Sequence, residues 1–116
     1  MSKRLDPVEQ ERLIERLAVL LDQARRDRRL LTYLEVADAL AVPGPHRIHK
    51  TTRLLEMLLK QDVEAGRPIR AALAVSRAGR GRPAPGFFDR ARRLGLPVGT
   101  DEALFHARLV AELHDQ

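Results

Sequence analysis

The sequence predicts a single, mainly α-helical domain with one short β element. The chain has 116 residues and is 44% hydrophobic. This is enough for one domain with a hydrophobic core and too little for two independently folded domains. Three Phe, one Tyr and no Trp leave the interior to Leu, Val, Ile and Ala, and this composition favours helices. Apolar residues also recur at helical spacing along much of the chain. We therefore expect one domain over residues 1–116.

The first helix is predicted to begin after Asp6. Asp6 can cap it, Pro7 suits the first helical position, and Glu9 stands three residues after the cap as in a capping box. One apolar stripe follows, and the helix is expected to end near Arg28; the stripe consists of Leu13, Ile14, Leu17, Leu20, Leu21 and Ala24. Arg25, Arg26, Arg28 and Arg29 lie near the C-terminus of this helix, where positive charges complement the helix macrodipole. The alternative role for these arginines is contact with phosphate.

A pair of helices is predicted next. Thr32 and Glu35 form a second capping box at the start of a short helix, and the turn Pro43–Pro45 ends it. A longer helix then runs from about His46 to Glu64. By helical arithmetic its inner side is expected to carry Ile48, Thr52, Leu55, Leu59 and Asp62, and its opposite side His46, His49, Lys50 and Arg53.

A short capped helix, a tight turn and a longer helix that is basic outside form the pattern of a helix-turn-helix motif, in which the second helix enters the major groove of DNA. Arginine and lysine there can contact guanine edges or phosphates. The DNA-binding residues predicted on this helix are His46, Arg47, His49, Lys50 and Arg53. The alternative is an ordinary solvated helix face.

Two stretches resemble a known family. The segment LTYLEVADAL resembles the start of bacterial winged helix-turn-helix domains, and GRPIRAALAVSRAGRGRPAPGFFDRARRLG is similar to small bacterial winged-helix-like domains that largely lack an assigned function. The resemblance covers about Leu31 to Gly95. It implies a winged helix-turn-helix-like fold with additional N- and C-terminal helices. Two departures are the long turn at Pro43–Pro45 and the lack of a second strand, so we expect a wing made of one strand and a loop.

The predicted wing carries concentrated positive charge. A short strand is expected from Ile69 to Ser76, followed by a flexible glycine loop. From Arg77 to Arg93 the chain has six arginines and one acid, a charge of +5 that equals the net charge of the protein. A small core cannot desolvate unpaired guanidinium groups, so Arg77, Arg80 and Arg82 must face solvent or a partner.

The chemistry of these arginines favours a polyanionic partner. Guanidinium groups pair with phosphates and fit narrow A·T minor grooves, so we predict DNA binding by Arg77, Arg80 and Arg82. A charge run that only promotes solubility is the alternative. Phe87 and Phe88 are expected to pack into the core behind the loop, and stacking on bases is the alternative for them.

A last helix is predicted after Thr100 or Asp101, either of which can cap it. Its apolar residues cover much of its circumference, which requires a cover on two sides; they are Leu104, Phe105, Leu109, Val110 and Leu113. We expect this helix to pack on the first helix or to form part of a dimer interface, and we predict a homodimer through the terminal helices.

Several classes of function find no support in the sequence. The chain has no cysteine, no apolar signal core and no run of about 20 apolar residues, so we expect a cytoplasmic protein that does not enter a membrane. The only serines are Ser2 and Ser76, and no nucleophile elbow or phosphate-binding glycine loop is present. His46 and His49 have i, i+3 spacing without further ligands nearby, so we expect no metal site.

These observations predict a non-enzymatic protein without a cofactor that binds double-stranded DNA. It would act as a small transcriptional regulator or as an accessory of a DNA-processing system. The main alternative is a protein-interaction adaptor that has the winged-helix shape and uses the arginines against an acidic protein. RNA binding is a further alternative.

Overall fold

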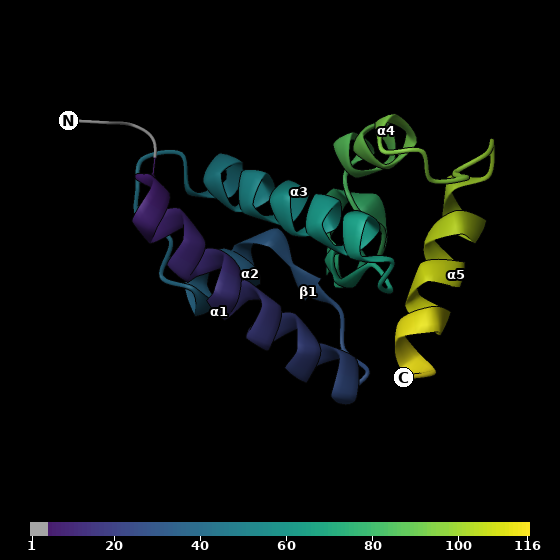
Figure 1. Ribbon diagram of the computed structural model, residues 1–116, viewed down its shortest axis with the longest axis horizontal. Helices are drawn as coiled ribbons and strands as arrows, with labels where there is room; N and C mark the ends of the chain where they lie inside the picture. Colours follow the sequence, from purple (N-terminus) through teal and green to yellow (C-terminus); the bar gives the residue numbers. More distant parts are fainter. Residues whose placement is uncertain (1–4) are drawn as a thin grey trace.

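The computed structural model describes residues 5–116, which form five α-helices and a small two-stranded parallel sheet (Figure 1). In chain order the elements are α1 (Pro7–Arg26), β1 (Leu31–Thr32), α2 (Tyr33–Ala39), α3 (Arg47–Ala65), the 3₁₀ helix η1 (Arg70–Leu73), β2 (Ala74–Val75), the 3₁₀ helix η2 (Arg77–Gly79), α4 (Pro85–Arg93) and α5 (Glu102–His114). The prediction of a mainly α fold with a short β element is confirmed.

The helix starts follow the capping signals of the sequence. Asp6 caps α1, and its Oδ1 accepts a hydrogen bond from the Glu9 amide at 2.9 Å. Thr32 and Glu35 form a complete capping box at α2, because the Glu35 amide donates to Thr32 Oγ1 and the Thr32 amide donates to Glu35 Oε1. Asp101 caps α5. Helix α3 agrees with its predicted range and ends at Gly66, whose φ of 67° is the left-handed conformation that glycine adopts readily.

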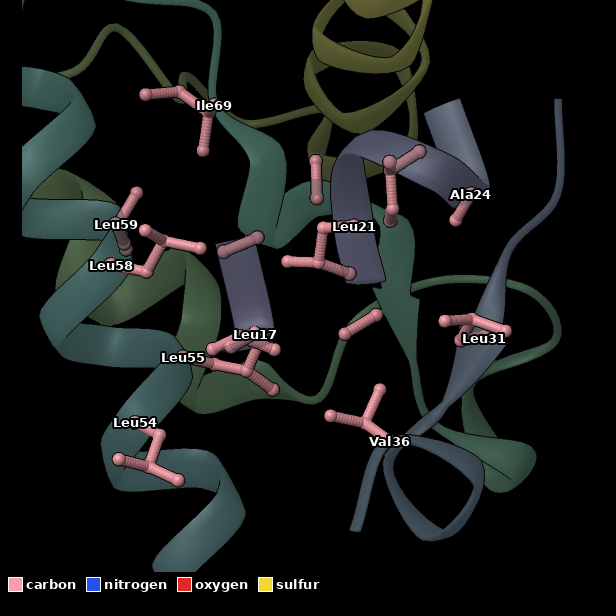
Figure 2. Close-up of a cluster of buried hydrophobic side chains, with 14 of the residues drawn as sticks. Leu17, Leu21, Ala24, Leu31, Val36, Leu54, Leu55, Leu58, Leu59 and Ile69 are labelled. Atoms are coloured by element: carbon pink, nitrogen blue, oxygen red, sulfur yellow. The ribbon is translucent and has the colours of Figure 1, made fainter. Parts of the chain in front are cut away.

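The core lies where α1 and α3 pack together, with α2 and η1 closing its sides (Figure 2). The buried stripe of α1 consists of Leu13, Leu17, Leu21 and Ala24. It meets Leu54, Leu55, Leu58 and Leu59 of α3, and Val36 of α2 lies at the edge of the same cluster. Removing this much aliphatic surface from water is the main stabilising contribution to such a fold.

The prediction of a strand from Ile69 to Ser76 is wrong for most of these residues. Residues 70–73 form η1, and only Ala74 and Val75 are in β conformation. β2 pairs in parallel with β1, with Leu31 opposite Ala74 and Thr32 opposite Val75. Every residue from Ala71 to Val75 is buried, so the segment shows no alternation between inner and outer faces, and periodicity could not distinguish a strand from a tight helical turn.

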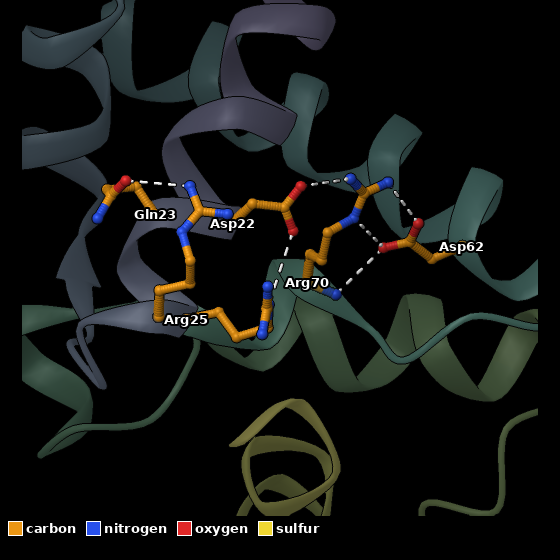
Figure 3. A network of polar contacts seen from close by, with 6 residues as sticks. Asp22, Gln23, Arg25, Asp62 and Arg70 are labelled. Atoms are coloured by element: carbon orange, nitrogen blue, oxygen red, sulfur yellow. Dashed lines mark hydrogen bonds and ion pairs between the residues drawn. The ribbon is translucent and has the colours of Figure 1, made fainter. Parts of the chain in front are cut away.

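A buried ion pair fixes the entry to β2 (Figure 3). Asp62 of α3 is fully buried, and it accepts hydrogen bonds from the Arg70 guanidinium at 2.8 and 3.1 Å and from the Arg70 amide at 3.1 Å. Asp22 of α1 lies 3.5 Å from the same guanidinium. The hydrogen bonds to Asp62 raise the pKa of Arg70 further above its usual value. This network joins α1, α3 and η1 directly before β2.

Helix α5 covers η1. His106 is buried and its Nε2 lies 2.8 Å from the Ala72 carbonyl oxygen. Burial lowers the pKa of His106, and the positive charge of Arg82 lowers it further. The imidazole is therefore neutral at pH 7, with Nε2 donating to the carbonyl. At the N-terminus of α5, about one turn before His106, Arg92 of α4 binds Glu102 at 3.0 Å, and it also donates to the Gly99 carbonyl at 3.2 Å.

Candidate nucleic-acid interface

The arginine loop, which we define as Arg77–Arg82, is a compact turn closed by backbone hydrogen bonds. The Ser76 amide donates to the Arg82 carbonyl at 2.8 Å and so closes the loop. Inside it, the Gly79 amide donates to the Ser76 carbonyl at 3.0 Å, and the Arg82 amide donates to the Gly79 carbonyl at 3.2 Å. The chain reverses at Arg80 and Gly81, which both have left-handed backbone conformations with φ of 53° and 82°. These bonds fix the directions in which the arginines leave the backbone.

Both ends of the arginine loop are held beside the start of α2. Val75, two residues before the loop, pairs with Thr32 in the parallel sheet. Two residues after the loop, the Ala84 amide donates to the Tyr33 hydroxyl at 2.8 Å. Burial raises the pKa of Tyr33, so the hydroxyl stays protonated at neutral pH. The sequence did not identify this role for the single tyrosine of the chain.

The three arginines of the loop have exposed side chains without a carboxylate partner within residues 5–116. Within the predicted cluster and beside it the arginines vary: Arg70 and Arg92 are bound to acids and Arg90 is only partly exposed, whereas Arg93 is exposed and has no carboxylate partner within residues 5–116, as is true of several arginines elsewhere on the surface. The positive cluster predicted from Arg77 to Arg93 is thus divided. Arg92 joins α4 to α5. Arg77 and Arg80 have no side-chain hydrogen bond to another residue within residues 5–116, and Arg82 donates only from its Nε, at 3.4 Å, to the Gly79 carbonyl of the loop. The terminal guanidinium nitrogens of all three remain available to an external acceptor.

The N-terminal half of α3 confirms part of the predicted basic face. His46, His49 and Arg53 are exposed. Lys50 was expected beside them, and that placement is wrong: only 8% of the residue is exposed, and its Nζ donates to the Pro43 carbonyl at 3.0 Å. Arg47 is half-exposed and is also engaged, because it donates to the Val42 carbonyl at 2.7 Å and to Asp38 at 2.9 Å.

The error at Lys50 comes from the orientation of α3. The residues that α3 buries in its first turns are Lys50, Thr51, Leu54 and Leu55, whereas Ile48 is 43% exposed and Thr52 is half-buried. Leu55, Leu59 and Asp62 are buried as predicted, and the buried side of the whole helix is centred roughly 65° from the predicted one. Lys50 and Arg47 reach back to carbonyl groups of the turn between α2 and α3 and stabilise that turn.

The two basic regions lie at opposite ends of α2. The sheet register places the arginine loop next to the first residue of α2, and α3 begins after its last residue. A helix of seven residues is roughly 10 Å long. The acidic side chains Glu35 and Asp38 are exposed on α2 between the two regions. The loop is therefore adjacent to the start of α2, and the bond between Arg47 and Asp38 holds the start of α3 near the end of α2.

The described residues carry no group of three or more His, Asp or Glu side chains that could hold a metal ion. No helix within residues 5–116 has the length and apolar character needed to cross a membrane. His106, which falls on the helix predicted after Thr100 or Asp101, contacts the carbonyl of Ala72 in the segment that leads to the arginine loop. No local pattern could have revealed this contact, since 34 residues separate His106 from Ala72.

Comparison of the chain with protein-family models, with curated proteins and with solved structures gave no match.

Proposed function

We propose that this protein binds double-stranded DNA through its arginine loop and performs no catalysis. The observation that carries the proposal is the state of Arg77, Arg80 and Arg82: three exposed guanidinium groups without a carboxylate partner in the described chain, on a loop held at both ends. Guanidinium groups form charge-assisted, forked hydrogen bonds with phosphate. A loop of fixed shape also loses little entropy when it binds.

The placement of the aromatic residues favours duplex over single-stranded nucleic acid. Phe88 and Phe105 are buried, and Phe87 is half-buried with its ring packed edge-on against Phe88 at 5.3 Å. Tyr33 is half-buried and engaged with Ala84. Unpaired bases are bound mainly by stacking on exposed aromatic rings, and no such ring is fully exposed within residues 5–116. Phosphate contacts along a duplex need none.

The order of elements supports a winged-helix-like mode of binding. A short helix, a turn and a longer helix are followed by η1, the strand β2 and a basic loop. β2 pairs in parallel with β1, which precedes the short helix, so the likeness to bacterial winged helix-turn-helix domains rests on the helix pair and the basic loop. In this mode His49 and Arg53 on the exposed side of α3 form a second contact, separate from the arginine loop. We infer that the protein is a small transcriptional regulator or an accessory of a DNA-processing system.

The test compares two triple variants with equal net charge. Arg77→Gln, Arg80→Gln and Arg82→Gln together remove the proposed contacts, whereas Arg67→Gln, Arg93→Gln and Arg108→Gln remove three exposed arginines from other parts of the surface. Titration of a fluorescent duplex at low salt should show a loss of at least about tenfold for the loop variant and a much smaller loss for the control.

Equal losses in both variants would mean that net charge alone attracts DNA, and the arginine loop would have no special role. If neither the wild type nor the variants bind duplex DNA, the proposal is wrong. The explanations left for the exposed arginines would then be binding of an acidic protein, binding of RNA, or a charge run that only promotes solubility.

A further inference from the structure

The outer face of α1 carries an apolar feature that the fold leaves uncovered. Val8 and Val19 are 72% and 69% exposed, more than any other large hydrophobic residue in the described chain. They are 11 residues apart, which corresponds to three turns plus about 20°, so both lie on one line along the helix. That line is opposite the buried stripe of Leu13, Leu17 and Leu21. In Figure 1, α1 forms one edge of the molecule.

The charges between the two valines are arranged to complement a second copy of the helix. Arg12 and Glu15 lie on the same outer line, are exposed, and have no ion-pair partner within residues 5–116. In an antiparallel pair of α1 helices centred between residues 13 and 14, each Val8 faces Val19 of the other copy. The same register places each Arg12 opposite Glu15 of the other copy.

The spacing of these residues lets one line of side chains, with valines at its ends and charges at its centre, face a second helix. Residues 8, 12, 15 and 19 follow the 4-3-4 spacing of a heptad seam, which keeps one line of side chains facing a partner helix. An open groove of about 570 Å³ runs beside the seam and adds room for partner side chains; it is lined by Glu15, Arg16, Val19, Leu20, Gln23, Ala39 and Leu40.

We propose that the Val8, Arg12, Glu15 and Val19 face of α1 is a homodimer interface, in which two copies of this chain pair α1 with α1 in antiparallel orientation. The outer valines and the unpaired charges each have a partner in this arrangement, and two-fold symmetry makes the pattern self-complementary. The proposal does not depend on DNA binding. It differs from a dimer through α5, which the broad apolar surface of that helix also suggested.

The first experiment measures the dimer by sedimentation equilibrium of the full chain at about 1 to 100 μM, a range that brackets weak homodimers. The wild type should show a reversible dimer, and Val8→Glu combined with Val19→Glu should be a monomer with unchanged helical circular dichroism. The matched control is Leu104→Glu, which changes an exposed leucine of α5 and should leave the dimer intact.

Charge exchange tests the register directly. Arg12→Glu brings two acids together at each contact, and Glu15→Arg brings two bases together, so each single variant should dimerise at least about tenfold more weakly than the wild type. An equimolar mixture of the two single variants should form a heterodimer, because every glutamate then faces an arginine. The double variant should dimerise like the wild type.

A change in the stability of α1 could not restore association only in the mixture. The proposal is overturned if the wild type stays monomeric throughout this range, if the mixture associates no better than its components, or if Leu104→Glu is the variant that dissociates the dimer.

Discussion

The Tyr33 hydroxyl accepts a hydrogen bond of 2.8 Å from the backbone amide of Ala84, across 51 residues of sequence. This bond holds the chain that returns from the arginine loop against the start of α2. Together with the Thr32 and Val75 pairing it fixes both sides of the loop. The loop should therefore be more ordered than its glycine content suggests.

Replacing Tyr33 with Phe removes the hydroxyl and keeps the ring. The Ala84 amide then has no acceptor, so the free energy of unfolding should fall by about 1 kcal/mol. Urea denaturation measures the loss, and hydrogen exchange should show faster exchange at Ala84 while the amides in the middle of α1 keep their protection. An unchanged exchange rate at Ala84 would show that the hydroxyl does not hold the loop.

The ion pair between Asp62 and Arg70 should be sensitive to the loss of one partner only. Asp62→Ala leaves a largely buried guanidinium without its main acceptor and should lower the free energy of unfolding by about 3 to 5 kcal/mol. The double variant Asp62→Leu with Arg70→Met removes both charges and should be less destabilised than Asp62→Ala. Asp22 binds the same guanidinium from a partly exposed position, so Asp22→Asn should lower the free energy of unfolding by about 1 kcal/mol or less. Chemical denaturation of the three variants gives the comparison.

His106 should make stability depend on pH in the acid range. Its pKa is lowered in the folded protein, so below about pH 6.5 the unfolded chain binds a proton that the folded chain does not. The contribution of His106 to the free energy of unfolding is fully present above pH 6.5, and it is lost as the pH falls toward the lowered pKa of His106 in the folded protein. His106→Gln keeps a donor for the Ala72 carbonyl but does not titrate. The drop in unfolding free energy between pH 7.5 and 5.5 should be smaller in this variant, and equal drops would contradict the assignment.

Arg80 should show opposite effects on stability and on binding. Its left-handed backbone, with φ of 53°, disfavours residues with a side chain and suits glycine. Arg80→Gly should therefore raise the free energy of unfolding by about 1 kcal/mol while weakening the binding of duplex DNA. Arg80→Gln is the control that removes the charge and keeps the strained backbone. Thermal denaturation and DNA titration of both variants separate the two effects, and a glycine variant with full affinity would exclude Arg80 from the interface.

The sequence allowed α1, α2, α3 and α5 to be predicted because their signals are local. Capping groups such as Asp6 and Thr32, and the apolar stripe of α1, depend only on residues within a few turns. The predictions that were wrong concern features that depend on tertiary contacts. The orientation of α3 is set by packing against α1, which moved the inner face from Ile48 to Lys50 and Thr51. The segment after α3 packs against α1, α3 and α5, and its residues Ala71 to Val75 are all buried, so no pattern in its sequence could indicate η1.

The same distinction applies to the candidate site. The exposure of Arg77, Arg80 and Arg82 could be predicted from their charge, since burying an unpaired guanidinium is costly. The residues that hold the loop could not be predicted, because Tyr33 acts on Ala84 through a contact between distant segments. Sequence also gave no indication that Arg92 would be used to join α4 to α5.

The proposed phosphate contacts are tested most directly by the salt dependence of duplex DNA binding. Each phosphate contact contributes about 0.9 to the slope of log affinity against log salt concentration, through release of counterions. If Arg77, Arg80 and Arg82 each contact a phosphate, their joint replacement by Gln should lower the slope by up to about 3, equally for A·T-rich and G·C-rich duplexes. A larger loss on A·T-rich DNA would place an arginine in the minor groove instead. A triple variant with the affinity and slope of the wild type would contradict DNA binding by the arginine loop.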